Sequence, residues 1–199
     1  GWWQTIPKER RLYLSIDNSF VEELDYSGMH VDLLYARHQS ICQLNDPYVF
    51  GCLTDEYRDQ TKIIFNRLIN AKKRPSLIQA LERDHSEGKV RLPKGLADFD
   101  EYIALIEEAH HQIAGSFLTG ASVSLQYMDS QIAECVMLRM LDEHSAVCLP
   151  IHDSFVVEIG KAKHLEAIMK ETFFDFVGSE AQVKAVSRSL SNSQRKERI

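Results

Sequence analysis

The fold is decided by FVEELDYSGMH (residues 20–30) together with IHDSFVV (residues 151–157). In each stretch an apolar, strand-favouring run carries an aspartate, Asp25 in the first and Asp153 in the second. Asp25 ends an extended run and is followed at once by a helical pattern, whereas Asp153 lies in a bend between two apolar runs. A single turn aspartate often only caps the backbone. Two of them in matching positions point to chemistry.

Each aspartate belongs to a predicted β-hairpin. In the first, residues 11–16 and 20–25 flank the turn residues Asp17-Asn18-Ser19. In the second, AVCLPI (146–151) and FVVEI (155–159) flank His152-Asp153-Ser154. If the two hairpins lie side by side in one sheet, both carboxylates emerge at the same edge.

Helical periodicity and end signals predict the remaining elements. Thr54 or Asp55 is a candidate cap, Pro75 is expected to end or break a helix, Asp98 with Glu101 resembles a capping box, and Gly178 is a stop signal. The expected helical ranges are 28–38, 54–73, a turn or two at LIQAL (77–81), 99–114, 123–143 and 161–177. Two hairpins among these helices predict an α+β fold with a small antiparallel sheet.

Composition is that of a globular protein with one substantial core, or one domain with a smaller lobe, in 199 residues. No apolar run approaches the roughly eighteen residues that a membrane span needs. The first residues, GWWQTIPKER, do not have the pattern of a signal peptide. We therefore expect a soluble, cytoplasmic protein. The four cysteines include no C-x-x-C pair, so free thiols are expected rather than a zinc site or a disulfide framework.

Charge argues against binding of nucleic acid by bulk electrostatics, because the formal net charge is -6. It leaves local binding open. Lys72, Lys73 and Arg74 form one compact basic cluster, and the tail is basic at Arg188, Arg195, Lys196 and Arg198.

The two aspartates predict a metal site. Two carboxylates that lie close together repel each other unless divalent cations sit between them. Two Mg²⁺ ions about 3.5–4 Å apart meet that need, with Mn²⁺ as an alternative, and can activate a hydroxyl while stabilising a leaving pyrophosphate. Arg58 and Lys62 are spaced i, i+4 on a predicted helix and could hold a triphosphate. A solvated face paired with Asp55, Glu56 and Asp59 is the alternative.

These segments resemble the single-subunit polymerases, which include the family A DNA polymerases and the phage-type RNA polymerases. DYSGMH is similar to their first motif, YRDQTKIIFNRLINA to the fingers helix with R-x-x-x-K spacing, and IHDSFVV to the third motif. LQYMDSQIAE is similar to the palm helix that supplies a Gln, here Gln126. WWQTIPKERR is similar to the lead-in of polymerase-like proteins of phages and mobile elements.

The resemblance implies a palm at 1–53 and 115–178, reduced fingers at 54–114 and a polar tail at 179–199. It implies template-directed nucleotidyl transfer with primer–template and nucleoside triphosphates as partners. Because no thumb segment is visible in the sequence, further protein domains or subunits are also expected as partners. Metal ligands would be Asp25, Asp153 and the backbone carbonyl of Tyr26.

The remaining site residues follow from the same resemblance. Arg58 and Lys62 would bind the triphosphate, and Gln126 would contact nucleic acid. His152 either orients ligands or primer, or is a hydrogen-bonded turn residue. His30 replaces the Glu that screens the sugar in the DNA polymerases, and Asn70 replaces a Tyr, so both are expected to shape the nucleotide pocket.

Two other functions stay open. A trimmed palm could serve only as a nucleic-acid-binding or assembly module, or the two carboxylates could belong to a metal-dependent nuclease. His110-His111 has a small prospect of a functional role, since adjacent histidines on a helix point apart. Trp2 and Trp3 could stack on bases, although aromatics that cover the core are commoner.

Overall fold

The computed structural model describes residues 1–186, so the basic tail residues from Arg188 onward lie outside the described part. The chain forms two compact units. One combines Gly1–Met29 with the segment from Asp129 onward, and the other is His30–Met128. The segments 30–53 and 115–128, which the sequence assigned to a palm, therefore belong to the same unit as the helices at 54–114.

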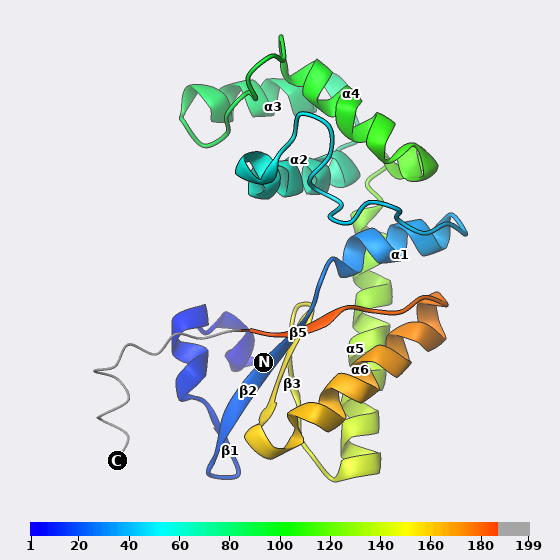
Figure 1. Ribbon diagram of the computed structural model, residues 1–199. Helices are drawn as coiled ribbons and strands as arrows, with labels where there is room; N and C mark the ends of the chain where they lie inside the picture. The colour runs from blue at the N-terminus through cyan, green and yellow to red at the C-terminus, as the bar shows by residue number, and fades with distance from the viewer. Residues whose placement is uncertain (187–199) are drawn as a thin grey trace. The chain divides into compact units, whose positions relative to one another are not determined.

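The first unit is built on a five-stranded antiparallel sheet (Figure 1). The order is β1-β2-β4-β3, and β5 also pairs with β2. The strands are β1 (Ser15–Ile16), β2 (Ser19–Tyr26), β3 (Leu149–Ile151), β4 (Ser154–Glu158) and β5 (Val183–Ala185). The predicted α+β class with a small antiparallel sheet is confirmed.

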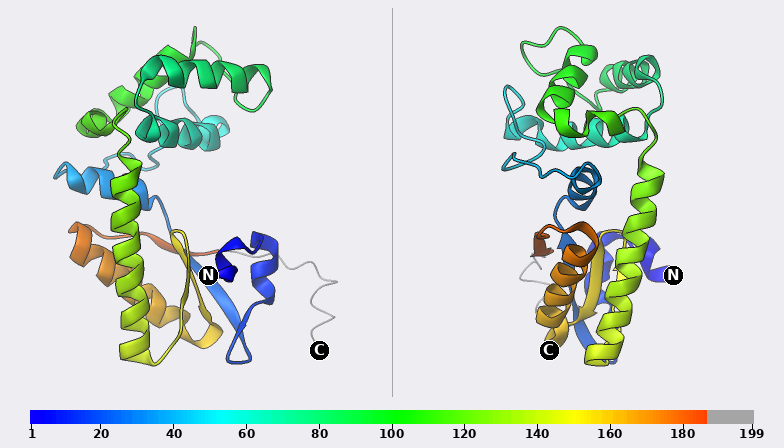
Figure 2. Two further views of the ribbon diagram at one scale, coloured as in Figure 1. Left: turned by 180° about the vertical axis from the view of Figure 1, so that it is seen from behind. Right: turned by 90° about the vertical axis from the view of Figure 1, so that its right-hand side faces the viewer.

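One face of this sheet packs on α6 (Ala162–Val177), which runs alongside β2 and β4 (Figure 2). Side chains alternate between the faces of a strand, and Tyr26 lies on this face. The ring of Tyr26 packs 5.5 Å from that of Phe173, and its hydroxyl donates to the carbonyl of Met169 at 2.6 Å. The end of β2 is thus attached to α6.

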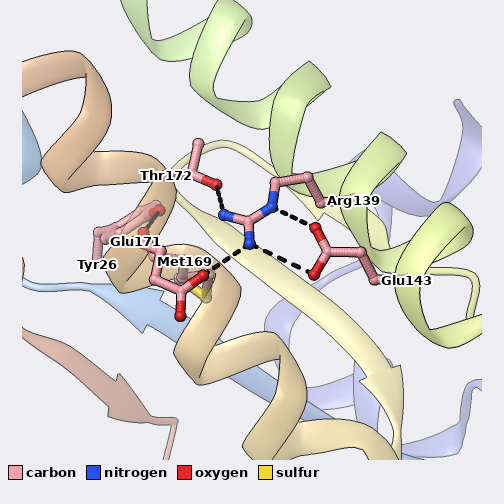
Figure 3. Close-up of polar contacts among 6 residues, drawn as sticks. All are labelled: Tyr26, Arg139, Glu143, Met169, Glu171 and Thr172. Atoms are coloured by element: carbon pink, nitrogen blue, oxygen red, sulfur yellow. Dashed lines mark hydrogen bonds and ion pairs between the residues drawn. The ribbon is translucent and has the colours of Figure 1, made fainter.

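Helix α6 is tied in turn to α5 (Ser122–His144) through Arg139 (Figure 3). The Arg139 guanidinium bonds to Glu143 of its own helix and to Glu171 of α6, both at 2.7 Å. It also donates to the hydroxyl of Thr172 at 3.3 Å. Both helices have the ranges that the sequence predicts to within one residue at each end.

The other face of the sheet is covered by the N-terminal segment. Ile16, Val21, Ile151 and Val156 form an apolar cluster there. Trp3 packs on it and donates its indole N–H to the carbonyl of Pro150 at 3.0 Å. Of the two N-terminal tryptophans, Trp3 therefore covers the core, whereas Trp2 is 68% exposed.

Three strand predictions are corrected. Half of the segment 11–16 expected as a strand lies in the 3-10 helix Lys8–Tyr13, and only Ser15–Ile16 pairs with β2. Because β1 pairs only with Ser19 and Phe20, the same edge of β2 is left open beyond them, and β5 pairs there with Leu24–Tyr26 inside the expected tail. The strand expected at 146–151 is only Leu149–Ile151.

The second unit is helical. It holds α2 (Arg58–Asn70), α3 (Arg74–Ser86), α4 (Phe99–Ala109), the 3-10 helices Asp55–Tyr57 and His111–Ser116, and most of α1 (Met29–Arg37). The Asp98 cap is confirmed, since its carboxylate accepts from the amide of Glu101 at 2.8 Å. Helix α2 stops at Asn70, before Lys73, and Pro75 lies in the first turn of α3, where the missing N–H costs nothing.

His110 is a core residue of this unit. Its side chain is fully buried, and Nε2 lies 2.8 Å from the carbonyl of Pro47. That carbonyl can only accept, so Nε2 carries the proton and Nδ1 accepts from the Tyr35 hydroxyl at 2.9 Å. Burial lowers the pKa of His110, so it serves as a neutral, fully bonded core histidine.

Within residues 1–186 no helix combines the length and the apolar character needed to cross a membrane.

Candidate active site

The predicted meeting of the two hairpins is found in the pairing of β2 with β4. Asp25 is the direct partner of Ser154, the residue that follows Asp153. The amide of Tyr26, which follows Asp25, donates to the carbonyl of Asp153 at 3.1 Å. Directly opposed residues in an antiparallel pair lie about 4.5–5.5 Å apart. Asp25 and Asp153 are therefore neighbours at one end of the sheet.

The turn before β4 is a tight one. β3 ends at Ile151 and β4 begins at Ser154, so only His152 and Asp153 connect them. His152 is exposed and has a φ of 55°, in the left-handed region. Its backbone conformation brings the chain back after β3, and its side chain is exposed.

A buried polar network lies beside the aspartates. The Glu23 side chain shares a face of β2 with Asp25 and is 2% exposed. Its carboxylate lies 3.0 Å from the Arg11 guanidinium and accepts from the Ser154 hydroxyl at 2.8 Å. This network links the N-terminal segment, β2 and β4, and the sequence reasoning missed it. The signal was available, because Glu23 is two residues from Asp25 in a strand.

Asp25 is partly accessible and has a cation near it. Its side chain is 25% exposed, and Oδ2 lies 3.9 Å from the Nζ of Lys184. Lys184 is the direct partner of Asp25 on β5. The lysine can stabilise the charge of this carboxylate from the sheet edge.

Arg58 and Lys62 share a face of α2, as their spacing predicts. The guanidinium of Arg58 lies 5.5 Å from the centre of the Tyr48 ring, and the Lys62 ammonium lies 5.9 Å from it. Arg58 is held by Asp46 at 2.6 Å and approaches Asp59 at 3.6 Å. Hydrogen bonding to Asp46 raises the pKa of Arg58. Lys62 is exposed.

The other expected nucleotide and nucleic-acid contacts also belong to the helical unit. His30 is half-buried in the first turn of α1, and Gln126 is exposed on α5. Asn70 is the last residue of α2, and its side-chain amide donates to the carbonyl of Asn66 at 2.8 Å.

One further acid in this unit was not singled out from the sequence. Asp32 lies in the first turn of α1, and burial raises its pKa to about 6. Its signal was a lone carboxylate in the apolar pattern HVDLLYA.

The residues that would hold a hard cation at the sheet end are Asp25 and Asp153, because Mg²⁺ is commonly held by one or two carboxylates together with water and substrate phosphates. In the described part of the chain there is no group of three or more His, Cys, Asp or Glu side chains arranged to hold a metal. A metal there would depend on substrate oxygens to complete its coordination.

No protein-family model and no curated protein matches this sequence. Among solved structures, the fold is similar to the polymerase (POL) domain of Pol1 from M. smegmatis, in complex with DNA primer-template and dNTP. The TM-score is 0.51 at 13% sequence identity. The match covers 92% of this chain and 43% of the solved one, so the chain spans less than half the length of that structure. The likeness is one of fold.

Proposed function

We propose that this chain carries a template-directed nucleotidyl-transfer site of the polymerase type. The observation that supports it is the register of β2 on β4, which makes Asp25 and Asp153 neighbours. The fold likeness to a polymerase domain also supports the proposal, and it does not depend on the sequence motifs.

In this proposal Asp25, Asp153 and the carbonyl of Tyr26 hold two Mg²⁺ ions. When bound, such ions lower the pKa of the attacking primer hydroxyl and neutralise the leaving pyrophosphate. The protein's own part is positioning. Arg58 and Lys62 would bind the triphosphate as a fork and a point charge respectively.

The remaining assignments concern specificity and the strand. His30 and Asn70 would shape the nucleotide pocket, and Gln126 and His152 would contact primer or template. Primer–template and nucleoside triphosphates are the partners that the fold likeness supports, since the solved neighbour holds DNA primer-template and dNTP. Because this chain spans 43% of that neighbour, further domains or subunits would complete the activity.

The test is extension of a labelled primer on DNA and RNA templates, with deoxyribonucleotides and ribonucleotides in turn. Asp25→Asn and Asp153→Asn should each abolish incorporation. Asp17→Asn is the matched control, because Asp17 is an exposed aspartate in the turn between β1 and β2. Incorporation that persists in both site variants would overturn the proposal.

A non-catalytic nucleic-acid-binding module is the second candidate, and the Lys184 ammonium at 3.9 Å from Asp25 favours it. In such a module the Lys184 ammonium, and not a metal ion, would balance the negative charge of Asp25. The discriminating measurement is thermal unfolding with Mg²⁺ or Mn²⁺ and nucleoside triphosphates. An idle site gives no metal-dependent stabilisation, whereas a working one does.

A further inference from the structure

A groove of about 610 Å³ lies in the helical unit, between the end of α2 and helix α3. Its floor is apolar, with the buried Leu77 beside Ala71 and Ala80. Its charged lining consists of four cations and one anion: Arg67, Lys72, Lys73, Arg83 and Asp84.

The anion does not neutralise this groove. Asp84 forms an ion pair with Arg67, with 2.5 Å between Oδ2 of Asp84 and Nη1 of Arg67. Hydrogen bonding to Arg67 lowers the pKa of Asp84. Lys72, Lys73 and Arg83 are exposed, and in residues 1–186 none of the three forms an ion pair. Four positive charges less one negative charge leave +3 in one groove, on a chain whose formal net charge is -6.

Of the basic cluster Lys72, Lys73 and Arg74 seen in the sequence, only the two lysines line the groove. Arg74 does not line the groove, because its guanidinium is held by Asp100 and Glu107 at 2.5 and 2.6 Å. Arg67 of α2 and Arg83 of α3 line the groove with Lys72 and Lys73.

The side chain of Lys72 passes close to Gly120. Gly120 has a φ of +72°, and a Cβ placed there would lie 3.4 Å from Cε of Lys72. The aliphatic stem of Lys72 therefore lies along Gly120, which leaves its ammonium at the groove.

The groove is distinct from the proposed triphosphate site. Arg67 follows Arg58 by nine residues, which is two and a half turns of α2, so the two side chains leave opposite faces of the helix. Arg58 and Lys62 are not part of the groove lining.

We propose that this groove binds the sugar–phosphate backbone of a nucleic-acid strand. Lysine ammonium groups suit phosphates as point charges and carry no base preference, so the contact is independent of sequence. The apolar floor provides a surface for the sugars between phosphates. This inference goes beyond the proposed function, because strand binding here requires neither a metal nor a triphosphate.

The experiment uses the full chain in EDTA with no nucleotide. A labelled single-stranded oligonucleotide and a hairpin primer–template are titrated by fluorescence anisotropy from 50 to 200 mM salt. Lys72→Ala/Lys73→Ala is compared with wild type and with Lys94→Ala/Lys163→Ala, which removes the same charge from two exposed lysines away from the groove.

Loss of two phosphate contacts should weaken binding of both probes. The slope of log K against log salt should become shallower by about 1.4 for the single strand and about 1.8 for the duplex. The control pair should leave both slopes unchanged. Equal affinities and slopes for the two double variants would overturn the proposal. So would a polyglutamate peptide that displaces the oligonucleotides as well as an unlabelled strand of the same charge does, because the groove would then bind acidic peptides.

Strand binding measured in EDTA needs no metal at Asp25. Failure of primer extension with strand binding intact would therefore count against the polymerase site and not against the groove.

Discussion

The backbone N–H of Tyr26 donates a hydrogen bond to the carbonyl oxygen of Asp153, with an N···O distance of 3.1 Å. The residue after one aspartate is thus hydrogen-bonded to the other aspartate. Since the Tyr26 hydroxyl also donates to Met169 on α6, a single residue fixes the end of β2 both within the sheet and against the helix beneath it. Burial raises the pKa of Tyr26, so the hydroxyl remains a donor at ordinary pH.

The Arg11–Glu23–Ser154 network should matter for stability and for alignment of the aspartates. Glu23→Ala leaves the Arg11 guanidinium, whose side chain is 14% exposed, without its carboxylate. We expect a loss of about 3 kcal/mol in urea unfolding. Ser154→Ala should cost about 1 kcal/mol and lower kcat for primer extension with little change in nucleotide KM. Equal stability of Glu23→Ala and wild type would show that the network contributes nothing.

Asp32 should make the protein less stable as pH rises. Its folded pKa of about 6 lies above the ordinary value of 3.8, so the folded state is penalised as pH rises from about 4 through 6. Asp32→Asn removes that penalty. It should stabilise the chain by on the order of 2 kcal/mol at pH 7 and by much less at pH 4. Chemical unfolding at both pH values measures this, with the exposed Asp55→Asn as control. A gain that is the same at pH 4 and pH 7 would contradict it.

His110 should contribute stability that is lost in acid. Burial lowers its folded pKa below the ordinary 6.5, so its contribution is complete above about 6.5 and falls as pH drops and the unfolded chain takes up a proton. His110→Leu leaves the Tyr35 hydroxyl and the Pro47 carbonyl unpaired and should cost about 3 kcal/mol at pH 7.5. The difference from wild type should narrow at pH 5.5. His111→Leu, on an exposed neighbour, should show neither effect.

The Arg139 network of Figure 3 should contribute a modest, salt-dependent stabilisation. The Glu143 and Glu171 side chains are 46% and 61% exposed, so solvent screens both pairs. Arg139→Ala should cost about 1 kcal/mol at low salt and less at 1 M salt. Arg139→Met keeps the apolar stem and separates packing from charge. A cost that does not change with salt would assign the effect to packing.

Lys184 should compete with a metal at Asp25, because its ammonium lies 3.9 Å from that carboxylate. Lys184→Ala removes a repulsive charge from the proposed site. We expect the Mg²⁺ concentration for half-maximal primer extension to fall severalfold. Lys161→Ala, on a lysine that binds the His144 carbonyl, is the control. An increase in the Mg²⁺ requirement would instead place Lys184 in contact with substrate phosphate.

Local sequence determined the hairpin turns, the helices α1, α5 and α6 and the α+β class, because each depends on nearby residues: period, caps and stop signals. It underestimated α3, which was expected as a turn or two and spans Arg74–Ser86. Asp98 capped its helix and Gly178 ended α6 as expected. The two matching apolar runs also predicted that the strand of Asp25 pairs with the hairpin of Asp153.

Tertiary structure alone decided which groups come together from distant segments. Arg11 with Glu23 and Ser154, Lys184 with Asp25, and Arg67 with Asp84 are contacts between separate elements. No periodicity encodes them, since they arise when strand edges and helix faces are matched in space. The same reason removed Arg74 from the basic cluster, because Asp100 and Glu107 of another helix hold its guanidinium.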